Sequence, residues 1–214
     1  MSTTMVRATA PATMIQVVVG PEDGGAGQML GGVYAGPPGF DPLAGYPEPD
    51  FDPEAQGFAR AGGGRAIYVG SIAGRLSTGT SLRLFCLELG VATGEGLGYA
   101  SSRWTGTPIP HLGAVARLVT GSYPLAAGAR AHADAQRAAA VQLAVWYFTN
   151  RVVLDPTSPL APLVAAIVAG VLAKGPLREP ATRRVTPGTV LRYVPADPTN
   201  PVPATAQQLI VAGP

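Results

Sequence analysis

Residues 81–89 read Ser-Leu-Arg-Leu-Phe-Cys-Leu-Glu-Leu, and this stretch decides the fold. Side chains alternate between the two faces of a strand, so the stretch presents apolar residues on both faces. One face carries Leu82, Leu84 and Cys86, and the other carries Phe85, Leu87 and Leu89. A strand that is apolar on both faces is covered on both sides, so we expect a central strand here.

Further strands are predicted on both sides of this one. Runs of β-branched and other apolar residues predict strands at 14–19, 65–75, 189–194 and 208–211. Residues 90–110 are rich in turn-forming residues and predict an irregular connection.

Three helices are expected between the first and the last strands, at 112–120, 131–149 and 159–173. In the second, Ala138, Val141, Val145 and Trp146 recur at helical spacing, and Gln142 falls in the same stripe. The order of strands, helices and strands predicts an α+β fold. We expect a mainly antiparallel, sandwich-like or barrel-like β lobe with an inserted α-helical lobe.

The length of 214 residues suits one domain. Residues 1–12 read as a polar tail and 13–214 as a single domain. A long Gly/Pro-rich and acidic insert covers 20–64, with a short strand expected near 32–34. Its acidic residues at 50–54 alternate as in some calcium loops, but the glycine and distal glutamate of such a loop are missing, which favours a solvated loop.

Composition argues against several classes of function. The net charge is +2, and Arg183-Arg184 is the only adjacent basic pair, so nucleic-acid binding is disfavoured. The longest apolar stretch, 160–173, is too short to cross a bilayer. A single cysteine rules out an internal disulfide. We expect no cofactor and no metal, because His and Cys are too few for a cage and no glycine-rich phosphate loop follows a strand.

Cys86 and Gln142 are each ordinary when taken alone. A buried cysteine behaves as a small hydrophobic residue, and a buried glutamine is usually satisfied by backbone groups. Their sequence contexts are more informative. Residues 85–88 read Phe-Cys-Leu-Glu, residues 141–146 read Val-Gln-Leu-Ala-Val-Trp, and a Gly-Ser-Tyr-Pro turn at 121–124 lies between them.

These three motifs resemble the thioester domains of Gram-positive bacterial surface proteins, including those of actinobacteria. That family has a cysteine after an aromatic or apolar residue and, on a helix, a Thr-Gln-x-Ala motif followed by Ile or Val and Trp. Val141 replaces the threonine here, which keeps the β-branched shape and loses a hydroxyl. The resemblance covers roughly residues 65–212 and is most specific over 82–150.

The resemblance implies an intramolecular thioester between Cys86 and Gln142, formed with loss of ammonia. A lysine amine on a target protein or surface would then attack the acyl carbon in a single turnover, so the chain would be an adhesion module rather than an enzyme. It also implies an extracellular, monomeric module of a longer surface protein, with leader and anchor outside this chain, and neither nucleic-acid binding nor membrane insertion.

Supporting roles are expected for residues near the two motifs. Glu88 lies two residues after Cys86 on the same strand face and is a candidate base. Trp146, one turn after Gln142, is expected to pack over the bond and limit water, and Phe85 and Val141 flank the reacting residues. His132 lies ten residues before Gln142, about 15 Å along the helix axis, too far to serve as the base.

Two other functions remain open from the sequence. The first is a cysteine-dependent hydrolase or acyltransferase that uses Cys86 with His111, which predicts a reactive thiol. The second is a structural assembly subunit in which Cys86 and Gln142 only pack, which predicts an inert thiol. Lys174 is the only lysine beside fourteen arginines. This suits an amine-reactive protein, although codon usage explains the count better.

Overall fold

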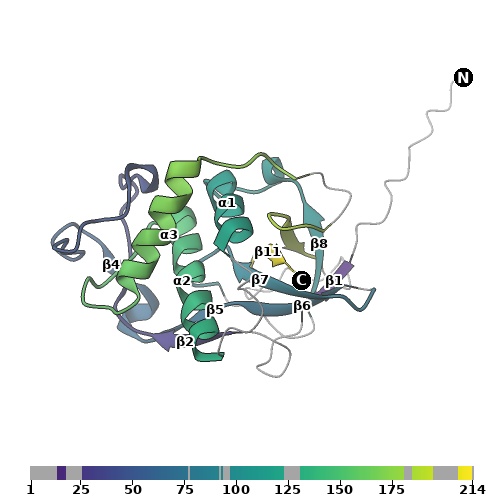
Figure 1. The fold of residues 1–214 in the computed structure, drawn as a ribbon, viewed down its shortest axis with the longest axis horizontal. Helices are drawn as coiled ribbons and strands as arrows, with labels where there is room; N and C mark the ends of the chain where they lie inside the picture. Colours follow the sequence, from purple (N-terminus) through teal and green to yellow (C-terminus); the bar gives the residue numbers. More distant parts are fainter. Residues whose placement is uncertain are drawn as a thin grey trace, which may run out of the picture.

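A computed structural model of the chain describes residues 14–17, 26–76, 78–91, 93, 97–122, 131–180, 185–194 and 207–213. A β-barrel and a helical part lie side by side (Figure 1). This arrangement confirms the predicted α+β class with a barrel-like β lobe and an inserted helical lobe.

Six antiparallel strands close the barrel in the order β1-β6-β7-β11-β10-β8. Their bounds are Met14–Val17 (β1), Ile72–Leu76 (β6), Ser81–Cys86 (β7), Gly98–Ser102 (β8), Val190–Tyr193 (β10) and Leu209–Gly213 (β11). β7 pairs with β6 on one side and with β11 on the other, so the predicted central strand is confirmed. Its two faces contribute to two different hydrophobic clusters, with Leu84 in one and Phe85 in the other.

Two small antiparallel sheets lie outside the barrel. Gly27–Leu30 (β2) pairs with Ile67–Gly70 (β5). Val33–Ala35 (β3) lies between Ala59–Arg60 (β4) and Val152–Leu154 (β9). Three short 3-10 turns complete the described chain, at Pro42–Ala44 (η2), Ala61–Gly64 (η3) and Trp104–Gly106 (η4).

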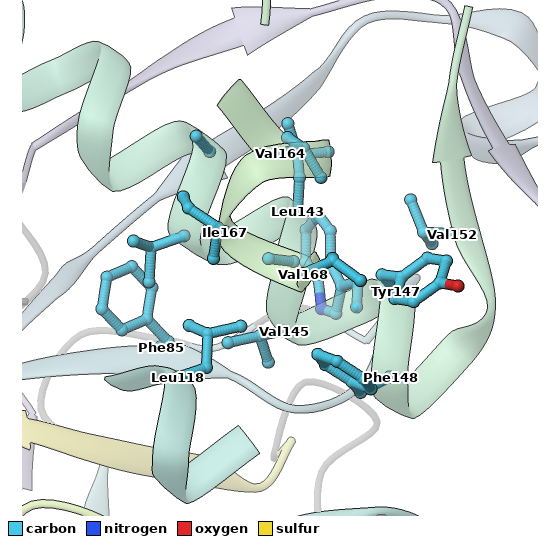
Figure 2. Packing of buried hydrophobic residues seen from close by; sticks show 14 of the residues in the cluster. Phe85, Leu118, Leu143, Val145, Tyr147, Phe148, Val152, Val164, Ile167 and Val168 are labelled. Atoms are coloured by element: carbon cyan, nitrogen blue, oxygen red, sulfur yellow. The ribbon is translucent and has the colours of Figure 1, made fainter. Parts of the chain in front are cut away.

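The helices are Leu112–Ser122 (α1), Ala131–Asn150 (α2) and Ala161–Lys174 (α3), each close to its predicted bounds. Residues 138–149 of α2 are buried on every side, because α1, α3, β5 and β9 all pack against this helix. Figure 2 shows Phe85 of β7, Leu118 of α1 and Val168 of α3 gathered around it. None of the described helices is long and apolar enough to cross a membrane.

Four of the described strands were not predicted from the sequence: β2 and β4 within the 20–64 segment, and β8 and β9. The expectation of an irregular connection over 90–110 is wrong at β8, whose residues Gly-Tyr-Ala-Ser-Ser have neither alternation nor β-branching. They are extended because β1 and β10 pair with them from both sides. β9 is only three residues long and directly follows α2, which leaves no periodicity to detect.

The segment at 20–64 is more ordered than predicted, although 20–25 lie outside the described residues. The short strand expected near 32–34 is present as β3. Tyr34 and Phe58 from this segment are buried in the main hydrophobic cluster, so the segment covers α2 rather than forming a loose loop. Asp52 and Glu54 are exposed, as expected for a solvated acidic loop.

Candidate functional site

Cys86 is the last residue of β7, where the barrel meets the helical part. It lies opposite Leu209 of β11, and it packs against both hydrophobic clusters. On its other side, β6 begins at Ile72, opposite Leu84. The sheet on that side therefore ends before Cys86 and leaves its backbone N–H and carbonyl without a strand partner.

Gln142 supplies the missing partner from the middle of α2. The backbone N–H of Cys86 donates to Oε1 of Gln142 (2.9 Å), and Nε2 of Gln142 donates to the carbonyl oxygen of Cys86 (2.8 Å). The side-chain amide thus takes the place of one more peptide group of β6. Gln142 is only 1% exposed, so both hydrogen bonds are formed away from water. The structure therefore brings the two predicted residues together.

The thiol of Cys86 is kept neutral by its surroundings. Burial raises its pKa from the usual value near 9 to about 12, and a side-chain hydrogen bond with Gln207 opposes this shift only in part. A thiol with such a pKa keeps its proton at neutral pH and is a poor free nucleophile.

Glu88 lies beyond the end of β7, and its contact differs from the predicted one. Its Oε2 accepts a hydrogen bond from the backbone N–H of Gln208 (2.7 Å). The N–H of Leu87 donates to the carbonyl oxygen of Gln208 (3.0 Å). These two bonds tie the segment after Cys86 to the start of β11. Glu88 therefore anchors Gln208, and the prediction that it serves as a base has no contact to support it.

A cavity of about 430 Å³ opens beside Cys86 and Gln142. Its walls come from β2, η3, β5, the start of β6, the end of β7 and the turn after it, α2, and Gln207, which lies two residues before β11. None of the described lining residues is charged. The lining residues are Met29, Gly62, Ala66, Ile67, Tyr68, Gly70, Ile72, Cys86, Leu89, Gly90, Val91, Thr93, Gln142, Trp146 and Gln207.

Two of these lining residues carry buried polar atoms that lack a hydrogen-bond partner among the described residues. They are Nε1 of Trp146 and Oε1 of Gln207, from side chains that are 5% and 3% exposed. A buried polar atom without a partner costs about 1–3 kcal/mol. Such atoms in a cavity wall are available to a ligand, and Trp146 lies at the cavity as expected from its place one turn after Gln142.

The remaining predicted residues lie away from the cavity. Phe85 and Val141 are fully buried and belong to the main hydrophobic cluster. His111 precedes α1 with a positive φ of 54°, and it is not among the cavity-lining residues. The side chain of His132 lies outside the described residues, as do Tyr123 and Pro124 of the predicted turn.

Gln207 is the one residue of the cavity that sequence reasoning missed although it contacts the cysteine. Its only signal was a pair of glutamines immediately before the apolar strand at 209–213. Nothing local places that pair next to Cys86, because the contact depends on the pairing of β7 with β11.

The comparisons with known proteins found solved adhesin domains at low identity. A pilus-presented adhesin, Cpa, in a cysteine-to-alanine form, is 15% identical with a TM-score of 0.38, over 66% of this chain and 40% of that chain. The N-terminal domain of the Streptococcus pyogenes pilus tip adhesin Cpa is 13% identical with a TM-score of 0.42, over 88% and 97%. The N-terminal thioester domain of the fibronectin-binding protein SfbI from Streptococcus pyogenes is 11% identical with a TM-score of 0.39, over 96% and 98%.

This chain thus spans less than half of the first of these structures. No protein-family model and no curated protein sequence matches the chain. At these identities and TM-scores, the likeness assigns the chain neither a family nor a function.

Proposed function

We propose that this chain is a covalent binding module. Cys86 and Gln142 form an intramolecular thioester, which reacts once with a primary amine, such as a lysine side chain, on a partner protein or surface. The observation that carries the proposal is the pair of hydrogen bonds that fixes the Gln142 amide against the main chain of Cys86.

The first step is formation of the thioester. Strand side chains stand perpendicular to the sheet, whereas the Gln142 amide lies along the hydrogen-bonding edge. Thioester formation requires the sulfur of Cys86 to reach a face of this amide, from which a nucleophile attacks the carbonyl carbon. The Cys86 N–H stabilises the negative charge that develops on Oε1. The S–C bond forms, the C–N bond breaks, and the thiol proton leaves with the nitrogen as ammonia.

The second step is attack by the partner's amine on the same carbon. An amide forms at residue 142, the S–C bond breaks, and a proton from the amine restores the Cys86 thiol. The restored thiol has a strongly raised pKa and does not react again readily. This accounts for single-turnover attachment rather than catalysis.

The mouth of the cavity supports a protein partner. Met29 and Tyr68 are directly opposite each other on β2 and β5, and they line the cavity with side chains that are 63% and 49% exposed. They are two of the three large hydrophobic residues that are exposed in the described part of the chain. Exposed apolar side chains around a reactive group suit a surface that docks a partner before the bond forms. The proposal includes an extracellular role for the chain as an adhesion module.

The test is the intact mass of fresh, folded protein without reductant. The expected result is a mass lower than the calculated one by one ammonia, and a single covalent adduct after treatment with methylamine. Replacing Cys86 by Ala should restore the full calculated mass and abolish the adduct.

Other outcomes point to the alternatives. An unmodified mass with a thiol that alkylates rapidly in the folded state would favour a cysteine-dependent hydrolase or acyltransferase. An unmodified mass with a thiol that reacts only after unfolding would favour a structural subunit, in which Gln142 only hydrogen-bonds the main chain of β7.

A further inference from the structure

Gln207 lines the cavity next to the sulfur of Cys86 and has a hydrogen-bond acceptor that no described residue uses. Its side chain hydrogen-bonds the thiol of Cys86, and its Oε1 is buried without a partner among the described residues. Because Oε1 has no partner among the described residues, the contact with the thiol is made by the amide nitrogen, which donates to the sulfur. The amide oxygen is then available close to the same sulfur, on a residue that lines the cavity.

The position of Gln207 is held by the backbone of its neighbour. Gln208 is tied by its N–H to Glu88 and by its carbonyl oxygen to the N–H of Leu87. Both contacts belong to the two residues that follow Cys86. They fix the chain just before β11 beside the end of β7, and Gln207 lines the same cavity as Cys86.

We propose that Gln207 is a further catalytic residue, which directs the incoming primary amine onto the thioester. This inference rests on the proposed function. Oε1 of Gln207 accepts a hydrogen bond from the attacking amine, and Nε2 donates to the sulfur as it leaves. The amine nitrogen bonds to the carbonyl carbon of residue 142, the S–C bond breaks, and one amine proton ends on the sulfur. Gln207 itself gains and loses no proton.

This arrangement selects the class of nucleophile. None of the described residues that line the cavity is charged, so an ammonium ion must lose its proton to enter favourably. Ile67, Leu89 and Val91 offer apolar contact to an alkyl stem. A neutral primary amine on a flexible apolar stem, as in lysine, fits both features and retains an N–H for Gln207.

The experiment compares Gln207→Met with Gln208→Met. The second is a matched control, because Gln208 is the adjacent glutamine, also has a buried Oε1 without a partner among the described residues, and does not line the cavity. Thioester content is measured first, from the loss of ammonia. Rates of adduct formation per thioester are then measured with methylamine and with 2-mercaptoethanol, whose thiolate has no N–H to donate.

For Gln207→Met, we expect thioester content like that of the wild type and a methylamine rate lowered by about tenfold or more, the equivalent of one good hydrogen bond. The mercaptoethanol rate should fall less, so that the preference for amine over thiol decreases. Gln208→Met should keep both rates and the preference. A general disturbance of the site would slow both nucleophiles alike, so it cannot explain a selective fall in the methylamine rate.

An unchanged amine preference in Gln207→Met, or equal loss in the two variants, would overturn the proposal. The proposal would also be overturned if Gln207→Met lacked the thioester while Gln208→Met retained it. Gln207 would then act in thioester formation instead. A wild-type protein that never loses ammonia is a different result, and it rejects the proposed function itself.

Discussion

Two hollows of nearly equal size differ in whether their buried polar atoms have hydrogen-bond partners. The cavity at Cys86 measures about 430 Å³, and a groove between α3 and the residues at 45–51 measures about 440 Å³. In the groove, the Tyr46 hydroxyl accepts a hydrogen bond from the N–H of Leu154 (3.0 Å). In the cavity, Trp146 and Gln207 keep buried polar atoms without partners among the described residues. Volume therefore does not distinguish the two hollows, whereas unsatisfied polar atoms beside a cysteine do.

The largest expected difference between the two hollows is in covalent chemistry. Gln142→Glu has no amide nitrogen to lose, and its second carboxylate oxygen would face the Cys86 carbonyl oxygen that now accepts from Nε2. We expect complete loss of the methylamine adduct. Ala169→Ser, in the wall of the groove, is the control and should react like the wild type. Intact mass after methylamine treatment measures both, and an adduct on Gln142→Glu would place the acyl group elsewhere.

The next largest effect concerns the thiol released by methylamine. Because burial raises the pKa of Cys86 from about 9 to about 12, alkylation by iodoacetamide at about pH 8 should be on the order of a thousandfold slower than for a denatured sample. Alkylation at the same speed in both samples would contradict the burial of the sulfur.

The same shift predicts how the stability of the released form depends on pH. A folded pKa above the unfolded one favours the folded state fully below about pH 9, and this contribution disappears as the pH rises toward 12. The free energy of unfolding of the methylamine-treated protein, measured with urea, should therefore fall above about pH 9. It should fall by more than that of the intact thioester form. The intact form is the control, because the tyrosines titrate equally in both.

A smaller effect is expected at the anchor of Gln208. Glu88→Gln keeps an acceptor for the Gln208 N–H but removes its charge, which should cost about 1 kcal/mol of unfolding free energy. It should also slow the methylamine reaction several-fold through Gln207. Glu54→Gln removes an exposed ion pair with Arg60 and serves as control, with no measurable change in rate. Equal behaviour of the two variants would reject the anchoring role of Glu88.

The smallest effect is expected from Trp146→Phe. This change keeps an aromatic wall and removes a buried N–H that has no partner among the described residues. The free energy of unfolding should therefore stay the same or rise, by at most about 1 kcal/mol. Trp146→Ala is the contrast, because it opens the wall and should speed hydrolysis of the thioester. Clear destabilisation by Trp146→Phe would mean that the N–H is engaged in the folded protein.

The candidate site was predictable where its signals are local. The two-faced apolar pattern of 81–89 specified a covered strand and so placed Cys86 between two cores. Helical spacing placed Gln142 and Trp146 on a buried stripe of α2. The place of Gln207 beside Cys86 and the contact of Glu88 with Gln208 could not be predicted from the sequence. Each depends on a neighbour more than a hundred residues away along the chain.

The sequence by itself determined β7 and the three helices, because apolar periodicity reports which faces avoid water. It singled out Cys86 and Gln142 as a pair only through the resemblance of their motifs to thioester domains. Only the tertiary structure decided that β8 exists, since its extended form depends on β1 and β10. It also decided that β6 ends early enough for Gln142 to complete the edge of β7. The physical reason is that strand partners and register are chosen by hydrogen bonds between distant segments, and side-chain patterns within one segment do not encode them.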